Sequence, residues 1–183
     1  MKKIFVFALT LCIAGKLSSQ EKEYKISKHS VDFSPLSPVM NIYALHYNYR
    51  ITSKSELVFS PSYMKIKYEN VGNTDAWGII AGYRRYLWKN LHVEYQLWPM
   101  LDRFYDEDTK RKMPLSFDLW NEFRLGYKFD FNIGSVPLFV NVQLPLGFGL
   151  YFDPNGKPEA WKEKNKKEPL FYFPPLFFLG IYF

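Results

Sequence analysis

The chain contains very little cysteine and histidine. Its 183 residues include one cysteine, Cys12, and three histidines, His29, His46 and His92. A single cysteine cannot form a disulfide within the chain, and the histidines are too far apart in sequence to resemble a metal-binding motif. A glycine-rich phosphate loop before a helix is also absent. The sequence therefore predicts no disulfide, no metal site and no cofactor.

Long apolar runs are also lacking. After residue 20, no stretch reaches the ~18 to 20 apolar residues that a transmembrane helix needs. The most apolar segment is interrupted by Pro174 and Pro175, which break helices. The sequence therefore predicts no membrane-spanning helix in residues 21–183.

The first 20 residues have the pattern of a secretory signal peptide. Lys2 and Lys3 precede the apolar segment 4–14, and small and polar residues follow as far as Gln20. Because the apolar segment is too short to cross a bilayer, we expect cleavage and an exported domain of residues 21–183. Loss of the three leader lysines lowers the formal charge from +6 to +3. This change removes the main argument for a nucleic-acid partner.

The dominant pattern in the rest of the chain is alternation of apolar and polar side chains. A period of two residues is typical of β-strands. The alternation is longest in 115–131 and in 138–152, where Phe152 falls on the apolar side. It recurs in 43–51, 77–84 and 91–101, so these segments are predicted strands.

One further strand departs from this pattern. Leu57 and Phe59 share one face, whereas Met64 and Ile66 have the opposite parity. Pro61 lies between the two pairs. Since a β-bulge reverses the side on which later residues point and accommodates proline, we predict a bulge at Pro61.

The connections predict an up-and-down arrangement. The short segments TSKS, WKN and NIGS alternate with longer, charged ones around ENVGNTD, DEDTKRKM and DPNGKPEAWKEKNKKEP. Short turns at one end and long loops at the other are typical of outer-membrane barrels, which normally have an even number of strands. The alternating segments and the C-terminal run give seven strands, so residues 23–33 are predicted to form the eighth. The predicted fold is an all-β, single up-and-down antiparallel transmembrane β-barrel of eight strands.

Period two does not decide which face of each strand points inward. A soluble barrel of the lipocalin kind would bury the apolar face, and it would carry a hydrophobic ligand. A membrane barrel would turn that face toward lipid. Strands longer than the ~5 to 6 residues of soluble sheets, and an aromatic content of 20%, favour the membrane barrel. Trp77 and Trp88, near strand ends, are then predicted interfacial anchors.

The segment FPPLFFLGIYF, residues 173–183, resembles the C-terminal signature of bacterial outer-membrane barrels. The resemblance implies that the barrel-assembly machinery reads the alternate apolar residues of the last strand. These are Phe173, Phe177, Leu179, Ile181 and Phe183. It further implies a location in the bacterial outer membrane, with its lipids and lipopolysaccharide as partners.

Three stretches are similar to small barrel proteins of unassigned function from Bacteroidetes-type genomes. They are YRRYLWKNLHVEYQLWP, FDLWNEFRLGYKFDF and FYFPPLFFLGIYF. This resemblance implies a fold and a location but no activity.

A membrane barrel would place the polar face of each strand in its lumen. The predicted lumen charge network is His46, Arg50, Arg84, His92, Glu94, Asp118, Glu122, Arg124 and Lys128. Because a barrel of eight strands has room for little more than its own side chains, these groups must pair with one another. Near balance of charge predicts a packed interior rather than a conducting pore. Trp98 and Trp120 are predicted to fill the same interior.

No catalytic residues are predicted. Small barrels that remove acyl chains from lipid A use a His-x-Ser pair, whereas His46-Tyr47-Asn48 has asparagine in the place of that serine. The predicted function is therefore structural or adhesive, through exposed loops. A lipid A-modifying enzyme and a secreted soluble barrel that binds a hydrophobic ligand remain the alternatives.

The longest loop has two interpretations. KPEAWKEKNKKEP is either a solvated loop of mixed charge or a surface that adheres to an anionic partner. The adhesive interpretation uses Lys164, Lys166, Lys167 and Trp161.

Overall fold

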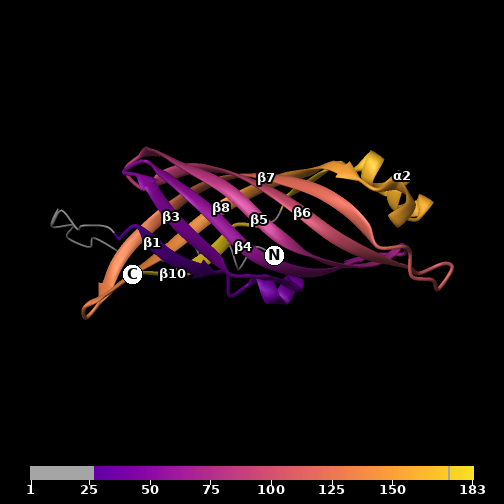
Figure 1. Ribbon diagram of the computed structural model, residues 1–183, viewed down its shortest axis with the longest axis horizontal. Coiled ribbons are helices and arrows are strands. Elements are labelled where there is room, and N and C mark those ends of the chain that lie inside the picture. The colour runs from indigo at the N-terminus through magenta and orange to yellow at the C-terminus, as the bar shows by residue number, and fades with distance from the viewer. Residues whose placement is uncertain (1–26, 173) are drawn as a thin grey trace, which may run out of the picture.

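The computed structural model describes residues 27–172 and 174–183 (Figure 1). The predicted signal peptide, residues 1–20, lies outside the described residues, as do Phe173 and the first part of the predicted strand 23–33. The strands are β1 (His29–Phe33), β2 (Ile42–Ala44), β3 (His46–Thr52), β4 (Ser55–Tyr68), β5 (Gly72–Trp88), β6 (Leu91–Asp106), β7 (Ser116–Ile133), β8 (Val136–Phe152), β9 (Leu170–Tyr172) and β10 (Leu176–Tyr182).

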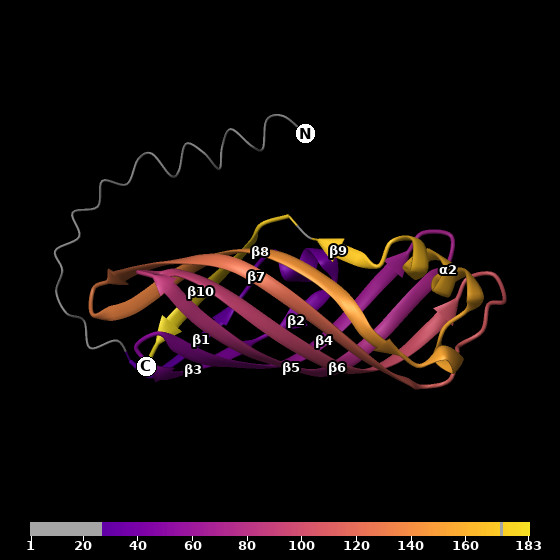
Figure 2. The same ribbon diagram turned by 90° about the horizontal axis from the view of Figure 1, so that it is seen from above.

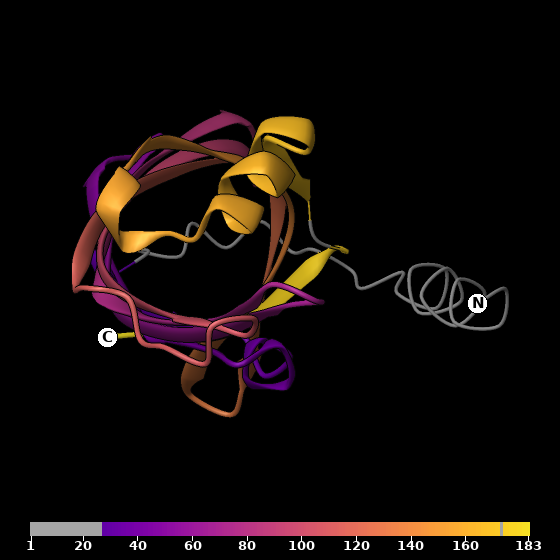
Figure 3. The same cartoon turned by 90° about the vertical axis from the view of Figure 1, so that its right-hand side faces the viewer.

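The strands close into a ring of antiparallel pairs. Strands β3 to β8 pair in chain order, and β10 pairs with β8 on one side and with β1 on the other. Strand β1 then pairs with β3, which completes a ring of eight strands. Figure 3 shows this ring from one end. The predicted all-β, up-and-down antiparallel barrel of eight strands is confirmed, and residues 29–33 supply the eighth strand.

The two ends of the barrel differ in their connections. Residues 53–54, 89–90 and 134–135 form tight turns at one end, which we call the short-turn end. The opposite, long-loop end carries segments 107–115 and 153–169. The prediction of a longer loop around ENVGNTD was wrong: Tyr68 and Gly72 pair directly, and Asn70 turns the chain with a positive φ of 58°.

The predicted bulge at Pro61 was also wrong. Strands β4 and β5 keep one unbroken register from the pair Ser55 and Arg85 to the pair Tyr68 and Gly72. Met64 and Ile66 therefore point inward. The change of parity in the sequence marks the place where the interior changes from polar to apolar.

A shift in register occurs instead between β7 and β8. Leu119 pairs with Tyr151, but Trp120 pairs with Gly149, so one residue of β8 is left over. This bulge turns Phe152 to the inside, where its ring lies 4.6 Å from that of Trp120. The sequence had placed Phe152 on the outer, apolar side.

Apolar side chains cover the outside of the barrel and polar ones are buried inside it. On β5, Ile79 is 57% exposed, whereas Arg84, which points inward from the same strand, and its partner Glu94 are at most 2% exposed. The same alternation holds along β6 and β10. Large outward apolar residues include Phe59, Tyr63, Ile79, Tyr83, Val93, Leu101, Phe117, Phe123, Leu125, Leu144, Leu146, Leu179 and Ile181.

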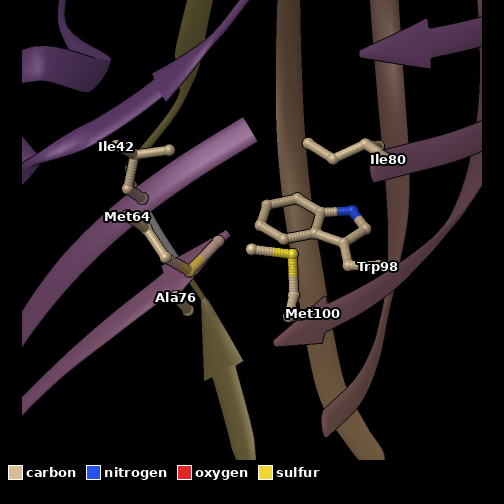
Figure 4. Close-up of a cluster of buried hydrophobic side chains, with 6 residues drawn as sticks. All are labelled: Ile42, Met64, Ala76, Ile80, Trp98 and Met100. Carbon is tan, nitrogen blue, oxygen red and sulfur yellow. The ribbon is translucent and has the colours of Figure 1, made fainter. Parts of the chain in front are cut away.

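Two apolar clusters occupy the part of the interior nearer the long-loop end. The first consists of Ile42, Met64, Ala76, Ile80, Trp98 and Met100. Figure 4 shows Met64 and Ile42 on one side of it, with Trp98 and Met100 facing them from the other. The second, closer to the long-loop end, consists of Val71, Phe104 and Trp161.

Helical segments lie outside or across the ring. They are η1 (Ser37–Met40), η2 (Pro154–Gly156) and α2 (Glu159–Lys167). Helix α2 lies across part of the mouth at the long-loop end, away from the C-terminus (Figures 1 and 3). Among the described helices, none is long and apolar enough to cross a membrane.

The wall of the barrel is interrupted on one side. Strand β1 ends at Phe33, and the chain then leaves the sheet through η1. Within the described residues, β2 pairs only with β4 and β9 pairs only with β8. Among the strands that the structure describes, none therefore joins β2 to β9 (Figure 2), and we call this interruption of the hydrogen-bonded wall the gap.

Candidate functional site

Glu56 is a centre of the buried charge network. It accepts hydrogen bonds from Arg50 Nη2 at 2.7 Å, from Arg84 Nη1 at 2.7 Å and from Lys128 Nζ at 3.2 Å. Strands β3, β4, β5 and β7 each contribute one of these four side chains. Three cations form ion pairs with this one carboxylate close to the short turns. Glu56 therefore links four strands at the short-turn end.

Glu94 continues the network toward the middle of the barrel. It accepts from Arg84 Nε at 2.5 Å and from Gln143 Nε2 at 3.1 Å. Arg124 donates to Gln143 Oε1 at 2.9 Å and to Glu122. Arg84 and Arg124 thus each contact at least one carboxylate, so the charges of these buried side chains compensate one another.

His46 belongs to a small polar group on β1 and β3. Its Nδ1 lies 3.0 Å from Asp32 Oδ1, and Asn48 donates to the other carboxylate oxygen at 2.8 Å. The ring of Phe178 stacks on His46 with centroids 5.1 Å apart. In the described part of the chain, no serine, threonine or cysteine side chain is hydrogen-bonded to this histidine. The geometry holds His46 in place and provides no activated nucleophile.

His92 is held by its neighbours in a comparable way. Its Nδ1 lies 3.1 Å from the carbonyl oxygen of Asn90, and its Nε2 lies 3.3 Å from Gln143 Nε2. Gly126 faces the ring so closely that an added Cβ would come within 2.4 Å of His92 Nε2. Glycine is therefore required at this position for the histidine to pack.

Asp118 was predicted to belong to the lumen charge network, but it lies apart from the other members, so this part of the prediction was wrong. It contacts Lys157 Nζ at 2.7 Å, and the same ammonium also contacts Asp102. Burial lowers the pKa of Lys157 to about 7, and the two carboxylates oppose this effect by favouring the charged form. Lys157 lies in segment 153–169, which folds over the long-loop end of the barrel. Its contacts with Asp102 and Asp118 therefore hold this segment against β6 and β7.

Trp161 closes the same end of the barrel. It is 4% exposed and its ring lies 4.8 Å from that of Phe152 and 6.2 Å from that of Tyr68. The adhesive interpretation of the loop, as far as it used Trp161 as a surface residue, was wrong because α2 turns this side chain inward. Lys166 and Lys167 remain exposed on the other side of α2.

A pocket of about 430 Å³ lies between the two apolar clusters. Its lining residues come from the end of η1, the β2 edge, strands β4 to β7, the segment around α2 and β9. They are Met40, Asn41, Ile42, Met64, Lys65, Ile66, Lys67, Tyr68, Thr74, Ala76, Trp98, Asp102, Asp118, Trp120, Lys157, Trp161, Lys164, Asn165, Glu168, Pro169, Leu170 and Phe171.

Four of the residues that build these sites were missed from the sequence. Glu56 and Lys157 were not assigned to the interior, and Asp32 and Gln143 were not recognised as buried partners. The inward parity of Gln143 on a clean strand could have identified it. No comparable pattern could have identified Lys157, because its partners depend on how a long loop folds back onto the barrel.

The predicted assembly residues on β10 occupy one face of that strand. Phe177, Leu179, Ile181 and Phe183 are all exposed on the outside of the barrel, and the alternate residues of β10 are buried. Outward exposure is the arrangement that recognition by another protein or by lipid would need.

The described residues contain no group of three or more potential metal ligands. Comparisons with protein-family models, with curated proteins and with solved structures found no match to this chain.

Proposed function

We propose that this protein is an integral β-barrel of the bacterial outer membrane, with a packed polar lumen and a structural or adhesive role through its exposed loops. The observation that carries the proposal is the inversion of burial: carboxylates and guanidinium groups fill the interior, and large apolar side chains cover the outside. Lipid is the solvent in which such an exterior is stable. Its surroundings would be the lipids and lipopolysaccharide of that membrane.

The height of the apolar exterior supports this proposal. On β6, Leu91, Val93, Leu97 and Leu101 point outward. From Leu91 to Leu101 the chain rises about 33 Å at ~3.3 Å per residue, or about 25 Å along the axis of a barrel with a strand tilt of ~40°. Outer-membrane barrels have an apolar band of about this height.

The apolar band on the outside of the barrel has a sharp boundary on the side of the long-loop end. Tyr63 and Trp77, directly paired with each other, form the last apolar row on β4 and β5. Two residues further along, Lys65 pairs with Asp75, which pairs with Arg103. A row of aromatic side chains followed by a row of charges is typical of the membrane interface.

The packed interior favours a structural role over transport. Glu56, Arg84, Glu94 and Lys128 are each at most 2% exposed, and they satisfy one another directly. An ion could pass only if several of these pairs separated.

The two alternative functions have less support. A secreted soluble barrel would leave its large outward apolar surface in water, which is costly and promotes aggregation. A lipid-modifying enzyme would use the Asp32 and His46 pair, but the described residues place no nucleophile in hydrogen-bond contact with it.

Membrane fractionation tests the proposed location. We expect the protein to remain in the membrane fraction after washing at high salt and alkaline pH, and to be released by detergent. Because closed barrels resist unfolding, the detergent-solubilised protein should migrate differently on electrophoresis before and after boiling. Recovery in the soluble fraction without detergent would rule out the proposal.

A second test concerns assembly through β10. We propose that the barrel-assembly machinery recognises the outward row that ends in Phe183. Phe183→Asp places a charge in this row, so the amount of heat-shifted protein in the membrane should fall severalfold. Phe183→Tyr, which keeps the ring, is the matched control. Normal assembly of the Asp variant would exclude the role given to Phe183.

A further inference from the structure

The gap in the barrel wall leads into an apolar space. Strand β1 ends before it reaches the level of β2 and β9, so these two edges lack a strand between them in the described residues. The pocket of about 430 Å³ is lined by residues from both edges, including Ile42 and Leu170. This volume lies within the ~300 to 1,000 Å³ typical of small-molecule sites.

The pocket is lined mainly by apolar side chains. Ile42, Met64, Ala76 and Trp98 from the first cluster form its floor, and Trp161 closes it toward the long-loop end. Most of the charge at its inner wall is compensated, because Lys157 contacts Asp102 and Asp118 Oδ2, and Asp118 Oδ1 is the one oxygen of this group without a hydrogen-bond partner in the described residues. A polar solute would therefore find few free hydrogen-bonding groups, whereas a flexible hydrocarbon chain would be accommodated by methionine and aromatic side chains.

The rim of the pocket has a different character. Lys65, Lys67 and Lys164 lie on it, together with Glu168. Lys65 is 3.8 Å from Asp75, but in the described part of the chain neither Lys67 nor Lys164 has a carboxylate within ion-pair distance. Two cations are thus available for an anionic group at the edge of an apolar pocket.

The position of the rim matches the boundary of the apolar exterior. Lys65 and Lys67 follow Tyr63 on the outer face of β4, at the level where the aromatic row gives way to charges. An amphiphile in the surrounding lipid would have its head group at this level and its hydrocarbon below it.

We infer that this pocket binds one acyl chain of an anionic amphiphile, which enters from the lipid through the gap between β2 and β9. The anionic head group contacts Lys67 and Lys164. The inference rests on the proposed membrane location and adds a ligand class that the location alone does not give.

Photo-crosslinking tests the site directly. The full-length purified protein would be reconstituted in phosphatidylcholine vesicles with a 16-carbon fatty acid that carries a diazirine in mid-chain. We expect labelled peptides from β4 and β5 around Met64 and Ala76. Ala76→Phe fills the floor of the pocket and should reduce this labelling about tenfold or more. Ala81→Phe, on the outer face of the same strand, is the matched control and should not change it.

A second pair of variants tests the rim. Lys67→Gln combined with Lys164→Gln should lower labelling by the fatty acid about threefold, because two partly exposed charges are lost. Labelling by the neutral fatty alcohol of the same length should be unchanged. Lys54→Gln combined with Lys112→Gln removes two exposed charges elsewhere and should affect neither probe.

The outcomes separate the pocket from the membrane location. Flotation of the vesicles reports membrane insertion, and the labelled positions report the pocket. Label spread over the outer face, or insensitive to Ala76→Phe in protein that shows the heat-dependent shift, would overturn the inference and leave the location standing. Protein that fails to float but is labelled at Met64 and Ala76 would overturn the location and the entry from lipid, and it would support only the acyl-binding pocket.

Discussion

Glu56→Gln is expected to lower the free energy of unfolding by about 3 to 5 kcal/mol, the usual cost of removing one partner from a buried ion pair. The substitution keeps the shape of the side chain but removes the negative charge shared by Arg50, Arg84 and Lys128. These cations would remain buried with less compensation. Urea unfolding of the reconstituted barrel, followed by the heat-dependent electrophoretic shift, measures the change.

Two controls make this prediction specific. Glu163→Gln removes an exposed carboxylate from α2, and it should change stability by less than about 0.5 kcal/mol. Adding Lys128→Met to Glu56→Gln should recover part of the loss, because one unpaired cation is then removed. Equal stability of wild type and Glu56→Gln would show that the network does not stabilise the short-turn end.

Planar-bilayer recordings of the wild type should show no steady, large channels, because the charged side chains fill the interior.

Ile79→Arg is expected to destabilise the membrane-embedded barrel by about 2 to 4 kcal/mol. Ile79 points outward from the middle of β5 and is 57% exposed. In water, an arginine at such an exposed position would be nearly neutral in its effect. In a bilayer its charge would lie in hydrocarbon, so the size of the effect distinguishes the two solvents. The measurement is again urea unfolding from vesicles.

Asn73→Arg is the matched control on the same strand. Asn73 also points outward, but it pairs with Lys67 and Tyr105 beyond the apolar band. The cost there should fall to about 0 to 1 kcal/mol, as for residues near the interface. A loss of stability that is equally small at both positions would contradict a lipid-facing exterior.

The strands and their order could be predicted because period two is a local property of the sequence. Alternation along 115–131 and 138–152, with short and long connections in turn, determined a closed meander of antiparallel strands. The inward face could not be decided in the same way. A barrel with an apolar interior and a barrel with a polar interior have the same alternation in sequence. Only the three-dimensional structure shows that Glu94 and Arg84 point into the ring.

The errors on β4 and β8 have a common cause. The prediction assumed that each face keeps one polarity along its whole length. On β4 the inward face instead changes from Glu56 to Met64, without any bulge. On β8 a true bulge before Phe152 left no mark in the hydrophobic pattern, because the residues around it are apolar on both sides.

The interrupted wall was beyond sequence reasoning for a different reason. Residues 43–51 alternate without a break, which suggests one continuous strand, yet the sheet contains β2 and β3 separated at Leu45. The gap arises because β1 ends at Phe33 and η1 carries the chain outside the ring. The contact of Lys157 with Asp102 and Asp118 also depends on long-range folding.

Along the inside of β4 the packing changes from polar to apolar, and the interior is closed at both ends of the barrel. The ionic cluster around Glu56 obstructs one direction, and the indole of Trp161 obstructs the other. A ligand that enters between β2 and β9 must therefore leave through the same opening. A molecule bound in this way would be retained by the barrel, and it could not pass through the interior from one end to the other.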